Sequence, residues 1–318
     1  MSSPRRSETS VAPTGALRTD APYPPQEVSF PGVSPRSTLP AGPRSLRAVH
    51  EIAFRIGSLT VHWYGILVAA GFMAGYWTAQ RRGVRDGLSP EAVADVVFWL
   101  FLGGLVGART LYVISYWREE FAGQPLSHIF TTRSGFVFYG GLIGATIFGI
   151  VFARWKKLQV WKLADALAPS VALGHALGRL GCFMTGCCHG RACDLPWAVH
   201  FPVEHATGGI GVHPTQLYES ALNFALYGAL AWLYRRKTFD GQIFAIYLMA
   251  YAPVRALVEN FRGDYAPEKF TGALSPGQVV SVGIFAAGVA FFVWFKSRAN
   301  KSPKSNVSKV QSPAPHSL

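Results

Sequence analysis

Apolar residues form seven long runs along this 318-residue chain, separated by shorter polar or mixed segments. The two runs at 136–153 and 274–295 contain no charged residue. Five further runs, each with one or more polar residues inside, lie at 59–79, 91–113, 164–181, 215–234 and 241–261. Since roughly 20 apolar residues in a helix cross a hydrocarbon core, the pattern predicts an all-α polytopic membrane protein with about seven transmembrane helices.

Basic residues follow every second predicted span. They cluster at 81–85, 154–157, 235–237 and 296–304. Because Lys and Arg accumulate in cytoplasmic loops, this alternation predicts a periplasmic N-terminus, a cytoplasmic C-terminus and a periplasmic loop region between spans four and five. The net charge of +13 then reflects topology. A nucleic-acid-binding protein gathers its basic residues on one soluble face. Here they are dispersed among separate loops, so no nucleic-acid partner is expected.

The two ends of the chain differ from its middle. Residues 1–50 contain nine prolines and six arginines, and 297–318 form a second polar tail. The first tail has a composition typical of disorder and lacks the apolar core of a signal peptide. Either the first span carries this basic tail outward or translation starts downstream. We expect one seven-span domain at 51–296, between a disordered N-terminal tail and a cytoplasmic C-terminal tail.

Ionisable residues inside the predicted spans mark a function or a buried pair, because each costs at least about 2.5 kcal/mol at membrane depth. In the sixth span Tyr251, Arg255, Glu259 and Arg262 share one helical face. One interpretation is mutual neutralisation of Arg255 and Glu259. The other starts from the surplus of positive charge, which suits a phosphate, because guanidinium binds phosphate oxygens bidentately. Pro253 is expected to interrupt this helix just before Arg255.

Three other spans contribute candidate residues at their ends. The fourth ends in "GHALGRLG", which brings Arg179 to the outer face as a second candidate for holding an anion. The fifth begins "HPTQLYES" and contains Glu219 in its second turn. The third begins with Tyr139, Gly140 and Gly141. The glycine spacing is typical of helix packing, while the Tyr139 phenol is placed to point into a polar cavity.

All four cysteines follow the fourth predicted span in a C-x₄-C-C-x₄-C pattern, at Cys182, Cys187, Cys188 and Cys193. A zinc site would favour C-x₂-C pairs or two Cys with two His, and neighbouring cysteines cannot easily both face one ion. No metal and no cofactor are therefore expected. A disulfide from Cys193 to Cys187 or Cys188 suits an oxidising compartment. The favoured interpretation is small packing residues in a glycine-rich turn.

Six segments together resemble the prolipoprotein diacylglyceryl transferase family. They are "HWYGILVAAGF", "GARTLYVI", "FYGGLIG", "GRLGCFMTGCCHGR", "HPTQLYES" and "YAPVRALVENFR", and they occur in the family's order between about 55 and 300. The resemblance implies a transferase of the bacterial inner membrane. It would move the diacylglyceryl group of phosphatidylglycerol, a membrane lipid, to the lipobox cysteine in the signal peptide of a preprolipoprotein, forming a thioether and releasing glycerol 1-phosphate.

The resemblance also implies roles for single residues. Arg179 and Arg255 would hold the phosphate, and Glu259 would orient the arginine face. The expected catalytic residues are Arg179, Arg255, Tyr64, Tyr139 and Glu259. The expected substrate-binding residues are Arg179, Arg255, Gly140, Gly141, Gly190, His213, Gln216, Tyr218, Glu219 and Tyr251.

One departure from the family concerns the base that would deprotonate the incoming thiol. Well-known members have His where this chain has Tyr139. A phenol, with an ordinary pKa of about 10, is a poor base at neutral pH. Either the base lies elsewhere, or the thiol ionises in the field of the arginines. The alternative function is an anion transporter, which would favour inverted repeats with two broken helices; the sequence has no such pairing.

Overall fold

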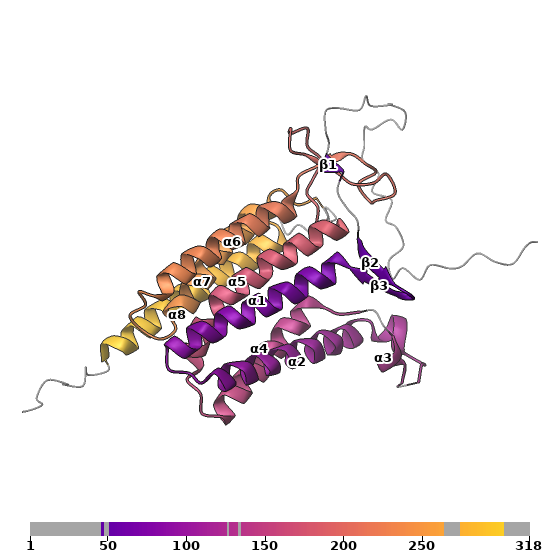
Figure 1. The fold of residues 1–318 in the computed structure, drawn as a ribbon. Coiled ribbons are helices and arrows are strands. Elements are labelled where there is room, and N and C mark those ends of the chain that lie inside the picture. The colour runs from indigo at the N-terminus through magenta and orange to yellow at the C-terminus, as the bar shows by residue number, and fades with distance from the viewer. Residues whose placement is uncertain (1–45, 48–50, 126, 133–134, 264–273, 302–318) are drawn as a thin grey trace, which may run out of the picture. The chain divides into compact units, whose positions relative to one another are not determined.

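The computed structural model describes residues 46–47, 51–125, 127–132, 135–263 and 274–301, and this part of the chain is mostly helical (Figure 1). The helices are α1 (Trp63–Arg85), α2 (Pro90–Ser115), the π-helical turn η1 (Trp117–Phe121), α3 (His128–Thr131), α4 (Phe138–Trp155), α5 (Val160–Thr185), α6 (Thr215–Tyr234), α7 (Gln242–Glu259) and α8 (Pro276–Lys301). Three of them, α2, α4 and α8, are long and apolar enough to cross a membrane.

Each predicted span overlaps one of the seven long helices in the described part of the chain, but the expectation of an all-α protein needs correction. The described residues also form five short strands: β1 (Leu46–Arg47), β2 (Ile52–Ile56), β3 (Leu59–His62), β4 (Val199–His200) and β5 (Gly211–Val212). The first predicted span therefore begins too early, because 59–62 pair with β2 as a hairpin. Its two-residue turn contains Gly57 at φ +58°, a conformation that glycine adopts without steric cost.

The predicted tails lie almost entirely outside the described residues. Within 1–50 the structure describes only Leu46–Arg47, which pair in parallel with Val199–His200 of β4. At the other end α8 continues to Lys301, so the first residues of the expected C-terminal tail extend the last helix.

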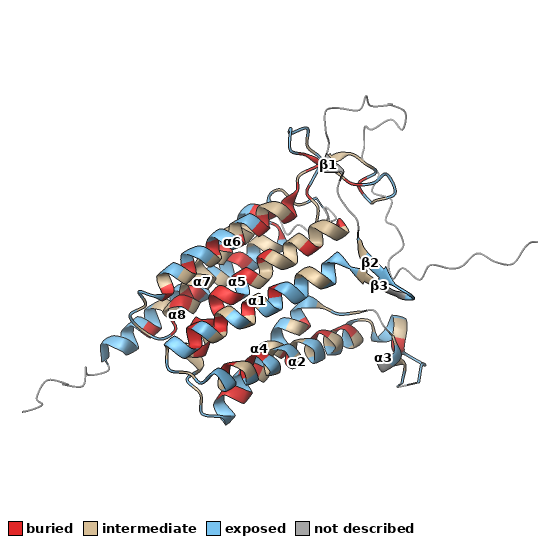
Figure 2. Ribbon diagram, in the orientation of Figure 1, coloured by how far each residue is buried: buried red, intermediate tan, exposed pale blue. Residues whose placement is uncertain are grey.

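Helix α5 lies at the centre of the helix packing. It packs against α1, α6 and α7, whereas α2 packs mainly against α4 and α7 against α8. Buried positions recur along α5, and most positions of α8 are exposed (Figure 2). Many exposed side chains on α2, α4 and α8 are large and apolar, including Phe98, Ile147 and Val282. Such surfaces are unfavourable in water and suit contact with lipid.

The contact between α2 and α4 is made through glycines. A Cβ on Gly107 would lie 2.3 Å from the carbonyl oxygen of Gly140, and one on Gly144 would lie 2.2 Å from that of Gly103. Neither helix tolerates a side chain at these positions. The predicted packing role of this glycine spacing is thereby confirmed, because small residues let helix backbones approach closely in membranes.

Pro253 does not interrupt α7, contrary to expectation. The helix runs from Gln242 to Glu259 with the proline inside it. Proline has no N–H to donate to the carbonyl of Met249, four residues earlier. Gly288 of α8 packs closely there, since a Cβ on it would lie 2.9 Å from the backbone nitrogen of Met249. Packing by a neighbouring helix is what lets membrane helices continue through proline.

An ionic network holds α1, α5 and the α6–α7 connection together at the helix ends far from Glu219. Lys237 contacts Asp86, the residue that follows α1, and lies 3.3 Å from the Asp165 carboxylate of α5. The side chain of Asp165 is fully buried and also accepts the backbone N–H groups of Gly241 and Phe244 at 2.9 and 3.0 Å. A buried charge needs such partners, because water is not available to it.

We predict that Asp165→Ala destabilises the protein by about 3–5 kcal/mol, because it leaves Lys237 buried with one partner fewer. Asp240→Ala is the matched control. Asp240 lies 3.7 Å from the same lysine, but its side chain is 45% exposed, and exposed pairs contribute at most about 1 kcal/mol. Thermal unfolding in detergent measures both variants. Equal unfolding midpoints for the two would contradict this account of the network.

Candidate active site

A buried carboxylate in the second turn of α6 organises the polar interior between α5, α6 and α7. Glu219 is 1% exposed. One of its oxygens, Oε1, lies 3.1 Å from Nε2 of His175. The other, Oε2, lies 3.0 Å from Nε of Arg179 and 4.0 Å from Nη1 of Arg255. The two arginines that are far apart in the sequence therefore face one carboxylate.

A second carboxylate lies on the other side of Arg255. Its Nη2 lies 2.6 Å from Oε2 of Glu259, so the ion pair that was one of the two interpretations of this helix face is formed. Ser275 donates a hydrogen bond of 3.0 Å to Oε1 of the same carboxylate. Gly277 packs against it, since a Cβ there would lie 2.5 Å from Oε1. The surplus of positive charge expected from α7 alone is reduced by Glu219 of the neighbouring helix, whose Oε2 lies 4.0 Å from Nη1 of Arg255.

The orientation of Arg179 leaves one edge of its guanidinium available. The Nε atom bonds to Glu219 and also lies 3.3 Å from Nε2 of His175. Among the described residues, no acceptor lies within hydrogen-bonding distance of its Nη1 and Nη2 amines. The side chain is nevertheless only 15% exposed. A guanidinium whose Nε is fixed by a carboxylate presents its two Nη amines in parallel. This geometry binds two oxygens of one anion.

His175 belongs to this site and was missed in the sequence. It lies one helical turn before Arg179, so the two side chains share a face of α5. Its ring also lies 5.5 Å from that of Tyr251 in α7. The i, i+4 spacing to a candidate arginine was the available signal. The structure thus brings together Arg179, Arg255, Glu259, Glu219 and Tyr251 of the expected residues and adds His175.

The start of α6 also holds the turn that follows α5. Thr215 donates a hydrogen bond of 2.8 Å to the carbonyl of Cys188, and Gln216 donates one of 2.7 Å to that of Cys187. Both donors are 1% exposed. Gln216 therefore supports the backbone of the cysteine turn, one helical turn from Glu219.

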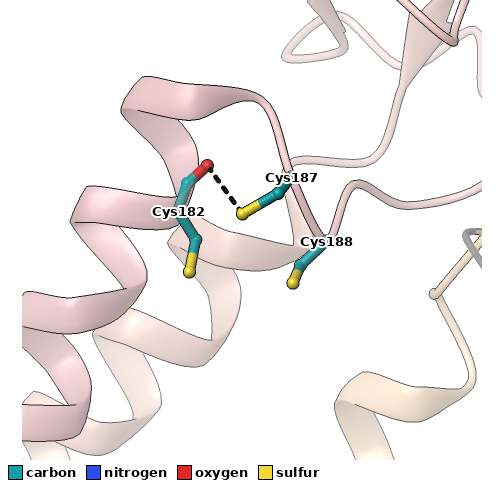
Figure 3. Close-up of side chains that lie close together, drawn as sticks. All are labelled: Cys182, Cys187 and Cys188. Carbon is teal, nitrogen blue, oxygen red and sulfur yellow. Dashed lines mark hydrogen bonds between the residues drawn. The ribbon is translucent and has the colours of Figure 1, made fainter. Parts of the chain in front are cut away.

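Three of the four cysteines converge at this turn (Figure 3). The sulfur atoms of Cys182, Cys187 and Cys188 all lie within 4.8 Å of one another. All four cysteines are free thiols, so the disulfide considered for Cys193 is not formed. Hydrogen bonds from the Cys182 and Cys187 thiols lower the pKa of Cys188, and the charges of Arg262 and Arg179 act in the same direction.

Gly190 is the meeting point of three backbone segments. Its N–H donates to the carbonyl of His213 at 3.0 Å, and it forms an isolated antiparallel bridge with Arg262. A Cβ on Gly190 would lie 2.5 Å from Cβ of His213 and 2.7 Å from the carbonyl oxygen of Phe261. Glycine is required at this position, because the three backbone segments approach too closely to leave room for a side chain.

His213 and Tyr218 lie in a separate aromatic group. The Tyr218 hydroxyl accepts a hydrogen bond of 2.8 Å from Nε1 of Trp197 and lies 3.4 Å from Nδ1 of His213. The ring of His213 lies 5.2 Å from that of Phe261. Burial and the charge of Arg191 lower the pKa of His213. Within the described residues, no hydrogen bond or ion pair joins His213 or Tyr218 to Arg179.

The remaining expected residues lie on α1 and α4. Tyr64 packs against Gly181, where a Cβ would lie 3.0 Å from its ring, and it lines an open, mostly apolar hollow of about 700 Å³. Gly140 and Gly141 lie in the contact with α2. Tyr139 is 59% exposed, and its ring contacts that of Phe138 at 5.9 Å. Its hydroxyl forms no hydrogen bond with any described residue.

Comparison with known proteins decides which chemistry this arrangement belongs to. The sequence profile of the prolipoprotein diacylglyceryl transferase family matches residues 51–294. The chain belongs to this family. It is therefore a transferase, the resemblance drawn from the sequence is confirmed, and the transporter alternative is set aside.

Similar proteins named phosphatidylglycerol–prolipoprotein diacylglyceryl transferase come from several bacteria. The one from Finegoldia magna is 35% identical over 254 residues, which cover 79% of this transferase and 98% of the relative. The one from Bordetella bronchiseptica is 36% identical over 254 residues, covering 77% and 95%. The one from a Nostoc species is 32% identical over 262 residues, covering 79% and 91%.

We predict that Gly190→Ala destabilises this transferase by about 1–3 kcal/mol, because the methyl group forces the backbone segments apart. Gly228→Ala is the control, since a Cβ on Gly228 of α6 meets nothing within 4 Å. Thermal unfolding and limited proteolysis of the 186–214 loop measure the effect. An unfolding midpoint unchanged in Gly190→Ala would show that the segments are not held together at this point.

Proposed function

We propose that this chain transfers the diacylglyceryl group of phosphatidylglycerol to the lipobox cysteine thiol of a preprolipoprotein. The observation that carries the proposal is the Arg179 guanidinium, which is held from behind by Glu219 at 3.0 Å while its Nη donors have no described protein acceptor. Membership in the family and the names of its relatives support the donor and the acceptor.

In this reaction a carbon–sulfur bond forms as a carbon–oxygen bond breaks. The thiolate attacks the glyceryl carbon that carries the phosphate, and glycerol 1-phosphate leaves with the bonding electrons. The thiol proton passes to solvent or to the leaving phosphate. Negative charge on the phosphate therefore grows from one toward two in the transition state. Donors aimed at this charge stabilise the transition state more than the bound lipid, which is the requirement for catalysis.

Arg179 and Arg255 meet that requirement in different ways. Arg179 donates hydrogen bonds from its two Nη amines to oxygens on one side of the phosphate. Arg255 is held between Glu219 at 4.0 Å and Glu259 at 2.6 Å, so its position is set before the lipid binds. Preorganised donors need no reorientation as charge develops. Glu259, and Ser275 behind it, then act as positioning residues for Arg255.

In this proposal the seven long helices cross the bacterial inner membrane, with the N-terminus periplasmic and the C-terminus cytoplasmic. Support comes from their lengths of 18 to 26 residues and from the apolar side chains exposed on α2, α4 and α8. Basic clusters at 81–85 and 235–237 lie on the cytoplasmic side. The β4–β5 loop and the site at the end of α5 then lie toward the periplasm.

The decisive experiment combines the purified full-length protein, phosphatidylglycerol and a synthetic lipobox peptide, and measures glycerol phosphate release and peptide mass. We expect one diacylglyceryl group per peptide. Arg179→Lys and Arg255→Lys keep the charge but lose bidentate geometry. Each should lower kcat/KM at least about tenfold, equal to roughly 1.4 kcal/mol.

Arg236→Lys is the matched control for these two variants. Arg236 is exposed after α6, where its guanidinium lies over the Trp232 ring at 4.0 Å, and its replacement should leave kcat/KM unchanged. An unmodified peptide with no phosphate released by the wild type would remove the proposed activity. Full activity in both lysine variants would remove only the roles proposed for the two guanidinium groups, the paired Nη donors of Arg179 and the preorganised charge of Arg255.

Tyr139 is proposed to donate a hydrogen bond to the lipid or the thiolate and not to act as the base. Loss of such a bond to a charged partner costs roughly 1.5–3 kcal/mol, so Tyr139→Phe should slow the reaction about ten- to a hundredfold. Its pH profile should keep the acidic limb of the wild type. Tyr139→His should retain substantial activity and gain an inflection near pH ~6.5, where imidazole titrates.

The measurement for these variants is kcat/KM against pH. A general base contributes about 10²–10⁴-fold and leaves its own pKa in the profile. If Tyr139→Phe removes the pH dependence together with nearly all activity, then Tyr139 is the base and the hydrogen-bonding role is wrong.

A further inference from the structure

The cysteine cluster is the group of reactive side chains that the transfer reaction leaves without a role. Cys182 is in the last turn of α5, and Cys187 and Cys188 follow the helix end (Figure 3). Their three sulfurs lie within 4.8 Å of one another. Cys187 is exposed, while the other two are half-buried. An exposed thiol does not fill a core, so the interpretation of these residues as packing filler fails for Cys187.

The backbone explains how two neighbouring cysteines face the same point. Gly186 ends α5 in the left-handed conformation at φ +76°. Cys188 is also left-handed, at φ +61°. The residues on both sides of Cys187 therefore have a left-handed backbone. A non-glycine residue in this region is strained, and such strain is concentrated at functional sites. Neighbouring cysteines on a regular backbone do not easily face one ion, but the left-handed residues of this turn bring Cys187 and Cys188 toward the same point.

Neighbouring groups hold the strained turn in place. Thr215 and Gln216 bond the carbonyls of Cys188 and Cys187 at 2.8 and 2.7 Å. The Thr185 hydroxyl donates to the sulfur of Cys187 at 3.3 Å. Second-layer hydrogen bonds of this kind orient metal ligands and are part of a built site.

The distances and charges suit a small, soft cation. Sulfurs that share one zinc ion at a Zn–S distance of about 2.3 Å lie roughly 3.8–4.0 Å apart, so each sulfur here needs to move less than about 1 Å. Three thiolates around a monovalent or divalent ion leave a net negative charge. Arg179 lies three residues before Cys182 in α5, and residues at this spacing are neighbours on a helix surface, so its positive charge offsets part of this negative charge.

We propose that Cys182, Cys187 and Cys188 bind one thiophilic d¹⁰ metal ion, Zn²⁺ or Cu⁺, through their three sulfur atoms. Thiolate ligands select these ions over Mg²⁺ and Ca²⁺. Binding displaces the thiol protons to solvent and involves no change of oxidation state. This proposal stands independently of the transferase reaction, because it concerns residues that the reaction does not use.

The test is a titration of the reduced full-length protein in detergent with Cd²⁺ under anaerobic conditions, followed by thiolate-to-cadmium absorbance. We expect saturation at one ion per chain. Cys182→Ser, Cys187→Ser and Cys188→Ser should each weaken binding at least about tenfold. Cys193→Ser is the matched control, because the chain has only four cysteines, and it should bind like the wild type. Competition by Zn²⁺ and by Cu⁺ then identifies the preferred ion.

A second measurement does not depend on the folding of the variants. In the wild-type protein Cys187 should be alkylated without metal and protected by stoichiometric Zn²⁺, while alkylation of Cys193 stays unchanged. Absence of saturable binding, or equal protection of Cys193, overturns the proposal. So does a disulfide between two of the three cysteines in protein purified without reductant, since the cluster would then be a redox pair.

Discussion

The arrangement of the site depends on one desolvated carboxylate. Glu219 is removed from water inside a helix bundle, and a buried anion is stable only when charged or hydrogen-bonding partners replace its hydration. Those partners are His175 and Arg179 of α5 at 3.1 and 3.0 Å and Arg255 of α7 at 4.0 Å. Without this anion the two guanidinium groups would repel each other. With it they converge, and one face of Arg179 is left for a ligand.

The first two turns of α6 connect this carboxylate to the cysteine cluster. Thr215 and Gln216 hold the cysteine turn, and Ser220 donates to the carbonyl of Ala176 at 2.9 Å. All of these side chains are buried within one short stretch of helix. A displacement of the α6 N-terminus would therefore move the arginine site and the sulfur cluster together. A metal ion in the cluster would stiffen the same turn that follows Arg179.

Two different kinds of contact support this region. At the seam of α2 and α4, glycines such as Gly107 and Gly144 let the backbones approach until no side chain fits. At the far ends of the helices, Lys237 links Asp86, which follows α1, to Asp165 of α5. Apolar side chains alone give little specificity between helices in lipid, because the surrounding lipid is equally apolar. Close backbone packing and buried ion pairs supply that specificity.

The sequence by itself determined the seven long helices, the placement of Arg255 and Glu259 on one helix face and the family, because hydrophobic runs and i, i+4 spacing are local properties. Only the tertiary structure decided that Glu219 faces Arg179, since these residues come from different helices. It also decided that α7 continues through Pro253, which depends on a neighbouring helix. The convergence of three cysteines required left-handed backbone on both sides of Cys187, and the energy that holds such a conformation comes from distant contacts that no local pattern records.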